Sequence, residues 1–155
     1  VVDADEAALE ADLEPFRTLA DRAPLGMTAH VRYSAWDDAN PGTLSRFVIE
    51  EVIRTRIGFT GLLLSDDIDM QALTGSVPER SLRAIEAGCD VVLNCWARMA
   101  EMVATARLLP AMGEGAAARL DRALGGCGAR DPDLADHEAL VATRDALLQL
   151  ARDPA

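Results

Sequence analysis

An apolar run that ends on three carboxylates constrains the fold of this chain more than any other feature. Residues 61–64, Gly-Leu-Leu-Leu, lead into Ser65 and then into Asp66, Asp67 and Asp69. A continuous apolar run is typical of a parallel strand covered on both faces, because an exposed face would need alternating polar residues. Ligands of α/β proteins gather at the carboxyl ends of such strands, and burying unpaired carboxylates is costly. We therefore expect the end of this strand to lie at the rim of a site.

The same strand-then-helix design occurs three times along the chain. The expected strands are 26–33, the acidic segment 61–70, and 89–95, and the helices that follow them are 44–57, the segment from Pro78 to Gly88, and 97–109. The expected start and stop residues are Thr43 or Ser45, Gly58, Gly88 and Pro110. Because strands that alternate with helices form right-handed crossovers, the pattern predicts an α/β fold with a parallel sheet.

The segments that flank these three units are expected to be helical. Residues 3–20 carry Leu9, Leu13, Phe16 and Leu19 at helical spacing, which predicts one amphipathic helix packed outside the sheet. Downstream, the expected elements are a short Ala-rich helix at 115–124, a glycine-rich break at 125–128 and a last helix at 136–152.

Composition indicates a soluble domain and excludes several classes of partner. The chain has 155 residues, is 50% hydrophobic and has a net charge of −11, which disfavours nucleic acid and anionic membranes as partners. The cysteines Cys89, Cys95 and Cys127 have neither zinc spacing nor an even count, so we expect Cys89 and Cys95 to be core thiols. No metal or organic cofactor is expected.

Three strands are few for an independent open sheet, and they are too few for a closed barrel. The chain also begins at Val1 without an initiating methionine. Both observations predict that these residues are a piece of a larger fold.

Four separated motifs follow one another at plausible spacing. They are Met27-Thr28-Ala29-His30, Thr43-Leu44-Ser45, residues 58–70 (Gly-Phe-Thr-Gly-Leu-Leu-Leu-Ser-Asp-Asp-Ile-Asp-Met) and residues 83–90 (Arg-Ala-Ile-Glu-Ala-Gly-Cys-Asp). In this order they resemble the bacterial β-N-acetylhexosaminidases of glycoside hydrolase family 3. The resemblance implies that residues 1–124 are the C-terminal portion of a TIM (β/α)8 barrel with outer helices, a fold of about 250 residues. Residues 125–155 would then be a linker and a C-terminal helical tail.

The resemblance also implies a role for Asp66. In the family, the first acid of the Ser-Asp-Asp motif is the nucleophile of a retaining hydrolysis, which passes through a covalent glycosyl-Asp intermediate. Successive strand residues face opposite ways, so Asp66 and Asp67 cannot both face one centre if the strand persists. Asp67 and Asp69 are therefore expected to cap the loop or hold backbone amides. The alternative for Asp66 is a simple helix cap.

Met70 and His30 are the expected substrate-binding residues. The position of Met70 in the family motif suggests an apolar wall near the sugar, with an ordinary core methionine as the alternative. For His30, a hydrogen-bonded imidazole that shapes the pocket is favoured over a general base, because no acid in its segment is placed to orient it. Trp36 and Trp96 follow strands and could stack on sugar, although loop aromatics more often cover the core.

The resemblance further implies what acts outside these residues. Similar enzymes carry a Lys-His-Phe-Pro-Gly-His-Gly stretch before the position of Val1, which supplies sugar-binding groups and the acid/base histidine. This chain has neither that stretch nor any lysine. Because general acid catalysis contributes about 10² to 10⁴ in rate, we expect the chain by itself to be nearly inactive. Longer relatives act on terminal N-acetylglucosamine, commonly from peptidoglycan turnover in the cytoplasm, and that setting is the expectation here.

Two alternatives come from other classes of protein. Asp67-Ile68-Asp69 resembles the acid pair that phosphoacceptor modules use around Mg²⁺, but receiver domains need a lysine, and the related phosphatases need Thr or Val where Gln71 stands. The second alternative is a degenerate or truncated barrel kept as a non-catalytic interaction module. Its open sheet edges would then favour self-association.

Overall fold

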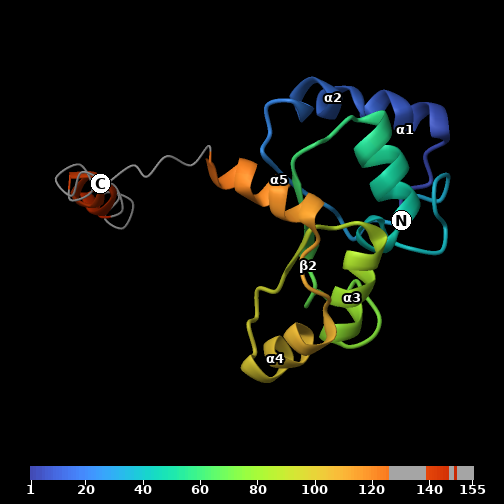
Figure 1. Cartoon of the computed structure of the whole chain (residues 1–155). Helices are drawn as coiled ribbons and strands as arrows, with labels where there is room; N and C mark the ends of the chain where they lie inside the picture. Colours follow the sequence, from blue (N-terminus) through green and yellow to red (C-terminus); the bar gives the residue numbers. More distant parts are fainter. Residues whose placement is uncertain (126–138, 147–148, 150–155) are drawn as a thin grey trace.

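The computed structural model describes residues 1–125, 139–146 and 149. Its centre is a three-stranded parallel sheet in the order β1-β2-β3, as the sequence predicts (Figure 1). The strands are β1 (Leu25–Met27), β2 (Leu62–Asp67) and β3 (Val91–Leu93). The helices are α1 (Glu6–Asp12), α2 (Glu14–Ala20), η1 (Gly42–Leu44), η2 (Phe47–Arg56), α3 (Val77–Ala87), α4 (Met99–Leu108) and α5 (Glu114–Gly125).

The helix-facing side of the sheet holds the hydrophobic core. Its buried members are Leu44, Ile49, Phe59, Leu63, Ile68, Leu73, Val77, Ala84, Ala87 and Cys89. The Phe59 ring lies so close to the strands that a β-carbon at Gly26 would come within 2.9 Å of it, and one at Gly61 within 2.6 Å. Glycine at these two positions therefore lets the ring pack directly on the backbone of the strands.

The crossover helices end where the sequence predicts. Gly58 and Gly88 have φ angles of +77° and +119°, a left-handed conformation in which residues with a side chain are strained. At the start of α3, Ser76 and Glu79 form a capping box. The first crossover helix, η2, is a π-helix of 10 residues, and Ser45 Oγ accepts a hydrogen bond from the Val48 N–H at 3.2 Å. Ser45 is thus the capping residue of the two candidates.

Strand β1 is much shorter than the expected strand at 26–33. The Thr28 N–H still donates to the Leu64 carbonyl of β2 at 2.9 Å, which ends the pairing. Beyond it, the Ala29 and Val31 carbonyls accept hydrogen bonds from the η1 segment, from the Thr43 and Gly42 N–H groups. After Thr28, these backbone carbonyls are therefore hydrogen-bonded to the η1 segment instead of to a neighbouring strand.

The prediction of a single helix over the N-terminal segment was wrong. The chain bends between α1 and α2, with Pro15 in the first turn of α2, where its missing N–H is tolerated. Leu9 and Leu13 are buried, whereas Phe16 and Leu19 are 60% and 52% exposed. Phe16 and Leu19 line an apolar cavity beside β1 and η2, together with the buried Leu13 and Ala20.

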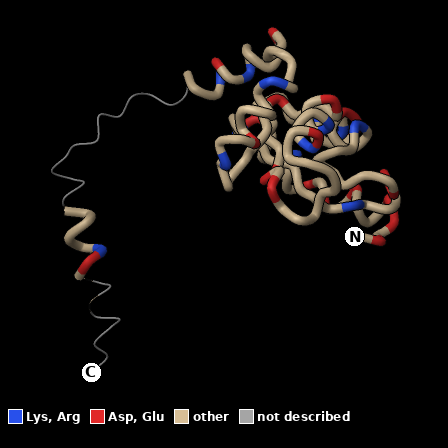
Figure 2. The backbone as a smooth tube through the Cα atoms, turned by 90° about the horizontal axis from the view of Figure 1, so that it is seen from below, with Lys and Arg blue, Asp and Glu red and all other residues tan. Residues whose placement is uncertain are grey.

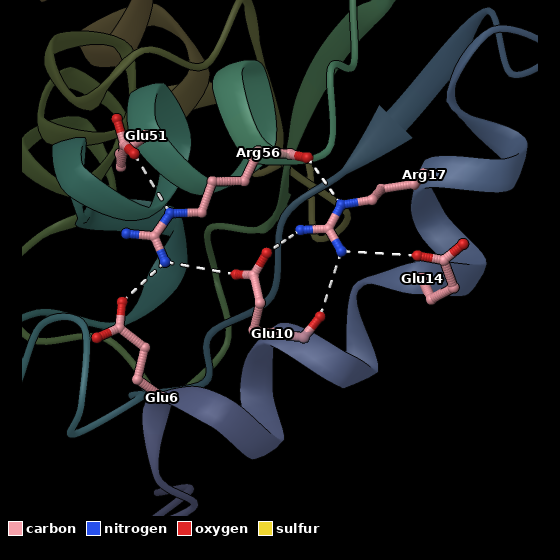
Figure 3. A network of polar contacts seen from close by, with 6 residues as sticks. All are labelled: Glu6, Glu10, Glu14, Arg17, Glu51 and Arg56. Atoms are coloured by element: carbon pink, nitrogen blue, oxygen red, sulfur yellow. Dashed lines mark hydrogen bonds and ion pairs between the residues drawn. The ribbon is translucent and has the colours of Figure 1, made fainter.

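Two arginines join this helical pair to η2 (Figure 3). Arg56 lies 2.9 Å from Glu6, 3.5 Å from Glu10 and 3.3 Å from Glu51. Arg17 bonds the Arg56 carbonyl at 2.9 Å and forms an ion pair with Glu10. Such partly exposed pairs each contribute about 0 to 1 kcal/mol, so they orient the helices more than they stabilise them.

At the C-terminal end, helix α5 confirms the prediction for 115–124. Of the expected last helix at 136–152, residues 139–146 are helical, and the glycine-rich break with Cys127 lies outside the described residues apart from Gly125. Acidic and basic positions are interspersed along the described backbone in the view of Figure 2. Within the described part of the chain, every helix is too short or too polar to cross a membrane.

Candidate active site

Asp66 lies at the carboxyl end of the central strand, where the sequence places the site. Its N–H donates to Thr28 Oγ1 at 3.2 Å, and its Oδ1 accepts the Asp67 N–H at 2.8 Å. The side chain is half-buried and forms no ion pair with any described residue. One carboxylate oxygen is thus held by the backbone, and the other has no hydrogen-bond partner among residues 1–125.

Asp67 holds backbone amides, as predicted. Its Oδ1 accepts the Asp69 N–H at 3.1 Å and the Cys95 N–H at 3.0 Å. These two bonds fix the turn after β2 and join it to the segment after β3.

Asp69 is a buried structural acid. Its side chain is 2% exposed and pairs with Arg98 at 3.1 Å, while its Oδ2 has no hydrogen-bond partner among the described residues. Arg98 also bonds Glu101 at 2.8 Å and lies 5.4 Å from the centre of the Trp96 ring. The acid therefore attaches the turn after β2 to the start of α4.

The pairing of β2 with β3 is irregular at the acidic motif. Leu64 pairs with Val91, whereas Asp67 pairs with Leu93, so β2 carries one extra residue between the two pairs. An extra residue interrupts the alternation of side chains, and such bulges are common beside active sites. The expectation that Asp66 and Asp67 face opposite ways rests on an unbroken strand, and the strand is not regular there.

His30 is hydrogen-bonded at both ring nitrogens. Nδ1 lies 2.8 Å from Thr43 Oγ1, and Nε2 lies 2.8 Å from the carbonyl oxygen of Asp67. Thr43 Oγ1 in turn lies 2.9 Å from Thr28 Oγ1. Sequence reasoning missed both threonines as site residues, although each stands in one of the motifs that carry the family resemblance.

The two described cysteines differ in environment. Cys89 is a buried core thiol, as predicted: burial raises its pKa to about 12, and its Sγ donates to the Thr43 carbonyl oxygen at 3.9 Å. The same prediction was wrong for Cys95, which is exposed because β3 ends two residues earlier. Desolvation and then the nearby carboxylates, Asp67 first, raise the pKa of the Cys95 thiol.

Met70 lies on the exposed side of the turn after β2. Its side chain is 43% exposed. Arg80 of α3 donates to the carbonyl oxygens of Ile68 and Met70 at 3.1 and 3.2 Å, which fixes the turn. Of the two tryptophans, Trp36 packs against Tyr33 at 5.2 Å between ring centres, and Trp96 is 68% exposed.

The arrangement disfavours the phosphoacceptor alternative. Asp67 Oδ1 is occupied by two amides and Asp69 by a guanidinium, so these acids do not converge on a common point. Residues 1–125 and the described tail contain no group of three His, Cys, Asp or Glu side chains placed to hold a metal ion.

Known proteins resemble this chain in both sequence and structure. Residues 1–124 match the glycosyl hydrolase family 3 N-terminal domain. A protein named beta-hexosaminidase from Alkalilimnicola ehrlichii is 52% identical over 93 residues, which are 57% of this chain and 26% of that protein. A beta-hexosaminidase from Idiomarina loihiensis is 35% identical over 115 residues, which are 73% of this chain and 34% of that protein.

Solved structures are also similar to this chain. CbsA from Thermotoga neapolitana superposes with a TM-score of 0.70 at 32% identity, over 83% of this chain and 32% of that one. NagZ from Neisseria gonorrhoeae, in complex with N-trifluoroacetyl-D-glucosamine, superposes with a TM-score of 0.68 at 30% identity, over 79% and 36%. The chain thus spans about a quarter to a third of the length of these relatives. On the match over residues 1–124, this chain belongs to the glycosyl hydrolase family 3, within its N-terminal domain.

Proposed function

We propose that this chain supplies the nucleophile half of a retaining β-N-acetylglucosaminidase, with Asp66 as the nucleophile. The observation that carries the proposal is the state of the Asp66 carboxylate. It stands at a strand end in a family 3 domain, one oxygen held by a backbone amide and the other without a partner among the described residues. A reacting carboxylate needs this combination of fixed orientation and one available oxygen.

The reaction would proceed in two steps. Asp66 attacks the anomeric carbon while the bond to the leaving oxygen breaks, and an acid/base group outside this chain protonates that oxygen. Water, activated by the same group, then opens the glycosyl-Asp ester and regenerates the carboxylate. The N-acetylated sugar as substrate is supported by the relatives named beta-hexosaminidase and by the NagZ complex with N-trifluoroacetyl-D-glucosamine. Peptidoglycan fragments and a cytoplasmic location remain expectations from the family resemblance.

Met70 and His30 would contribute to the substrate site in different ways. Met70 is exposed beside the acidic turn and can present an apolar wall to the sugar. His30 has both ring nitrogens engaged, so its contribution would be to shape the site rather than to bond the sugar through nitrogen.

The rest of the barrel would cover the apolar surface at β1. Leu25 and Met27 are 52% and 56% exposed on this edge strand, and an apolar cavity of about 430 Å³ opens between β1, α2 and η2. Upstream strands and helices of a (β/α)8 barrel would pack here. In the isolated chain, the same surface favours self-association, which is also what the non-catalytic alternative needs.

Hydrolysis of a chromogenic β-N-acetylglucosaminide tests the proposal. We would compare the 155-residue chain, a longer protein in which a family 3 upstream segment precedes Val1, and the Asp66→Ala variant of that longer protein. Activity only in the longer protein, and its loss in the variant, is the expected result. A longer protein that folds cooperatively but does not hydrolyse the substrate would favour the non-catalytic alternative.

A further inference from the structure

We propose that Thr28, Thr43 and His30 are positioning residues for Asp66, joined in a hydrogen-bond chain that runs in a single direction. This inference rests on the proposed function, since it assigns a catalytic consequence to the geometry around the nucleophile. The three residues come from the end of β1, the loop after it and η1, and none of them would touch the reacting atoms.

The donor-to-acceptor direction of this hydrogen-bond chain follows from one carbonyl group. The Asp67 carbonyl oxygen can only accept, so His30 Nε2, at 2.8 Å, must carry the proton. In a neutral imidazole the other nitrogen, Nδ1, is then an acceptor, and the Thr43 hydroxyl at 2.8 Å donates to it.

The rest of the order is then determined as well. Because the Thr43 hydrogen points to His30, the Thr43 oxygen accepts the Thr28 hydroxyl hydrogen at 2.9 Å. The Thr28 oxygen accepts the Asp66 N–H at 3.2 Å. Each hydroxyl therefore donates once and accepts once. The hydrogen-bond chain begins at the Asp66 N–H and ends at the Asp67 carbonyl, so both of its ends lie on the same short stretch of β2.

This closed chain holds the Asp66–Asp67 segment on both sides. The N–H before the Asp66 side chain and the carbonyl after Asp67 are both bonded to groups outside β2. The register of β2 against β3 shifts by one residue between Leu64 and Asp67, so the regular ladder is interrupted at Asp66, where the Thr28 hydroxyl binds the amide.

Burial makes this hydrogen-bond chain rigid. Thr43 is fully buried and Thr28 is 6% exposed, so water does not readily replace a lost partner. Changing either threonine to valine keeps the shape of the side chain but removes a donor and an acceptor. We expect the nucleophile to lose its alignment while the fold is kept.

The first test is the tautomer of His30 in the 155-residue chain, measured from ¹⁵N chemical shifts. His137 is the only other histidine in the sequence, and a His137→Gln variant assigns the signals. The expected spectrum shows a protonated Nε2 and an unprotonated, hydrogen-bonded Nδ1. In Thr43→Val the Nδ1 signal shifts towards that of a free nitrogen, and Thr43→Ser restores it. A proton on Nδ1, or a rapidly exchanging mixture in the unmodified chain, would overturn the proposed order.

The second test measures kcat and KM in the longer protein described above. Thr43→Val and Thr28→Val should each lower kcat by about 10-fold to 10²-fold with little change in KM, because alignment and not sugar binding is lost. Thr43→Ser should retain most of kcat. The matched control is Thr105→Val on α4, because the buried Thr105 hydroxyl has no hydrogen-bond partner among the described residues.

The outcomes separate this inference from the proposed function. If Asp66→Ala abolishes hydrolysis but both valine variants keep the kcat of the Thr105→Val control, the positioning role is wrong and the nucleophile stands. If Asp66→Ala remains active, the proposed function fails, and the catalytic role of the hydrogen-bond chain fails with it. Equal losses in Thr43→Ser and Thr43→Val would also contradict the inference, since the hydroxyl would then not matter.

Discussion

Asp90 and Asp66 are two carboxylates in one small fold, and their surroundings are opposite. Asp90, which directly precedes β3, is 3% exposed at its side chain and accepts from Arg54 at 2.9 Å and from Arg119 at 2.9 and 2.5 Å. It also accepts the Leu63 N–H at 2.9 Å. Asp66 has one backbone amide at its carboxylate and no arginine within the described residues. A structural acid is saturated with donors, whereas the candidate nucleophile keeps an oxygen for reaction.

The charge states follow from the same difference. Burial would raise the pKa of Asp90, but the Arg119 and Leu63 hydrogen bonds and the charge of Arg54 hold that pKa below its ordinary value. Asp90 therefore stays ionised and ties together η2, β2 and α5. At the other end of β2, Asp66 and Asp67 form no ion pair with any described residue, and desolvation and then the charges of Asp67 and Asp66 raise the pKa of the neighbouring Cys95 thiol.

The largest expected effect separates Asp66 from its neighbour. In the longer protein, Asp66→Asn should lower kcat by at least about 10³-fold, because the amide cannot form the glycosyl ester. Asp67→Asn keeps the Oδ1 acceptor for the Asp69 and Cys95 amides, so it should leave a folded and partly active protein. Steady-state kinetics gives kcat for both variants, and equal losses of kcat would refute the assignment of Asp66 as the nucleophile.

Asp90→Asn should have the opposite profile, with a large effect on stability. The substitution removes the negative charge between two guanidinium groups, which should lower the free energy of unfolding by about 3 kcal/mol. Urea denaturation of the 155-residue chain measures this. The matched control is Asp38→Asn, whose side chain is 73% exposed and lies 3.7 Å from Arg32, so a change below about 1 kcal/mol is expected. Similar values for the two variants would mean that the Asp90 cluster does not hold the fold together.

The pH dependence of stability gives a third comparison. Because the folded-state pKa of Asp90 is lowered, its contribution is fully present above the ordinary value of 3.8 and is lost as pH falls through the lowered pKa. The free energy of unfolding, measured by denaturation at a series of pH values from neutral to that acidic range, should therefore fall more steeply with decreasing pH for the unmodified chain than for Asp90→Asn. Parallel curves would show that Asp90 is protonated to the same degree in the folded and unfolded chains.

The smallest expected effect concerns the thiol beside the acidic turn. With its pKa raised, Cys95 should react with iodoacetamide only at higher pH than an ordinary exposed cysteine does. Replacing Asp67 by Asn should move the alkylation profile to lower pH, whereas replacing the distant Asp38 should not. Mass spectrometry of the modified peptide distinguishes Cys95 from Cys89, and an unchanged profile in Asp67→Asn would contradict the electrostatic explanation.

Most of the strand and helix order could be predicted because it depends on local signals. The apolar run before Asp66, the glycines at 58 and 88, and the spacing of apolar residues in α3 each determine a local conformation. The bend at Pro15 could have been read from the proline, which lies too far inside the expected helix of residues 3–20. The early end of β1 could not, because it depends on the turn at η1, which is distant in sequence.

The candidate site was only partly predictable for a similar reason. The family motif pointed to Asp66, and strand-end chemistry pointed to His30. The bonds from Thr43 to His30 and from Thr28 to the Asp66 amide join residues 13 and 38 positions apart, which no local pattern reveals. The pairing of Asp69 with Arg98, 29 positions away, belongs to the same class.

Trapping the covalent intermediate on the longer protein tests the assignment of Asp66 most directly. A fluorinated N-acetylglucosaminide with a good leaving group slows the opening of the glycosyl ester, and peptide mass spectrometry then locates the label. One sugar per protein is expected, attached to Asp66 and absent in Asp66→Asn. A label on Asp67 or Asp69, or rapid hydrolysis without any covalent species, would contradict this assignment.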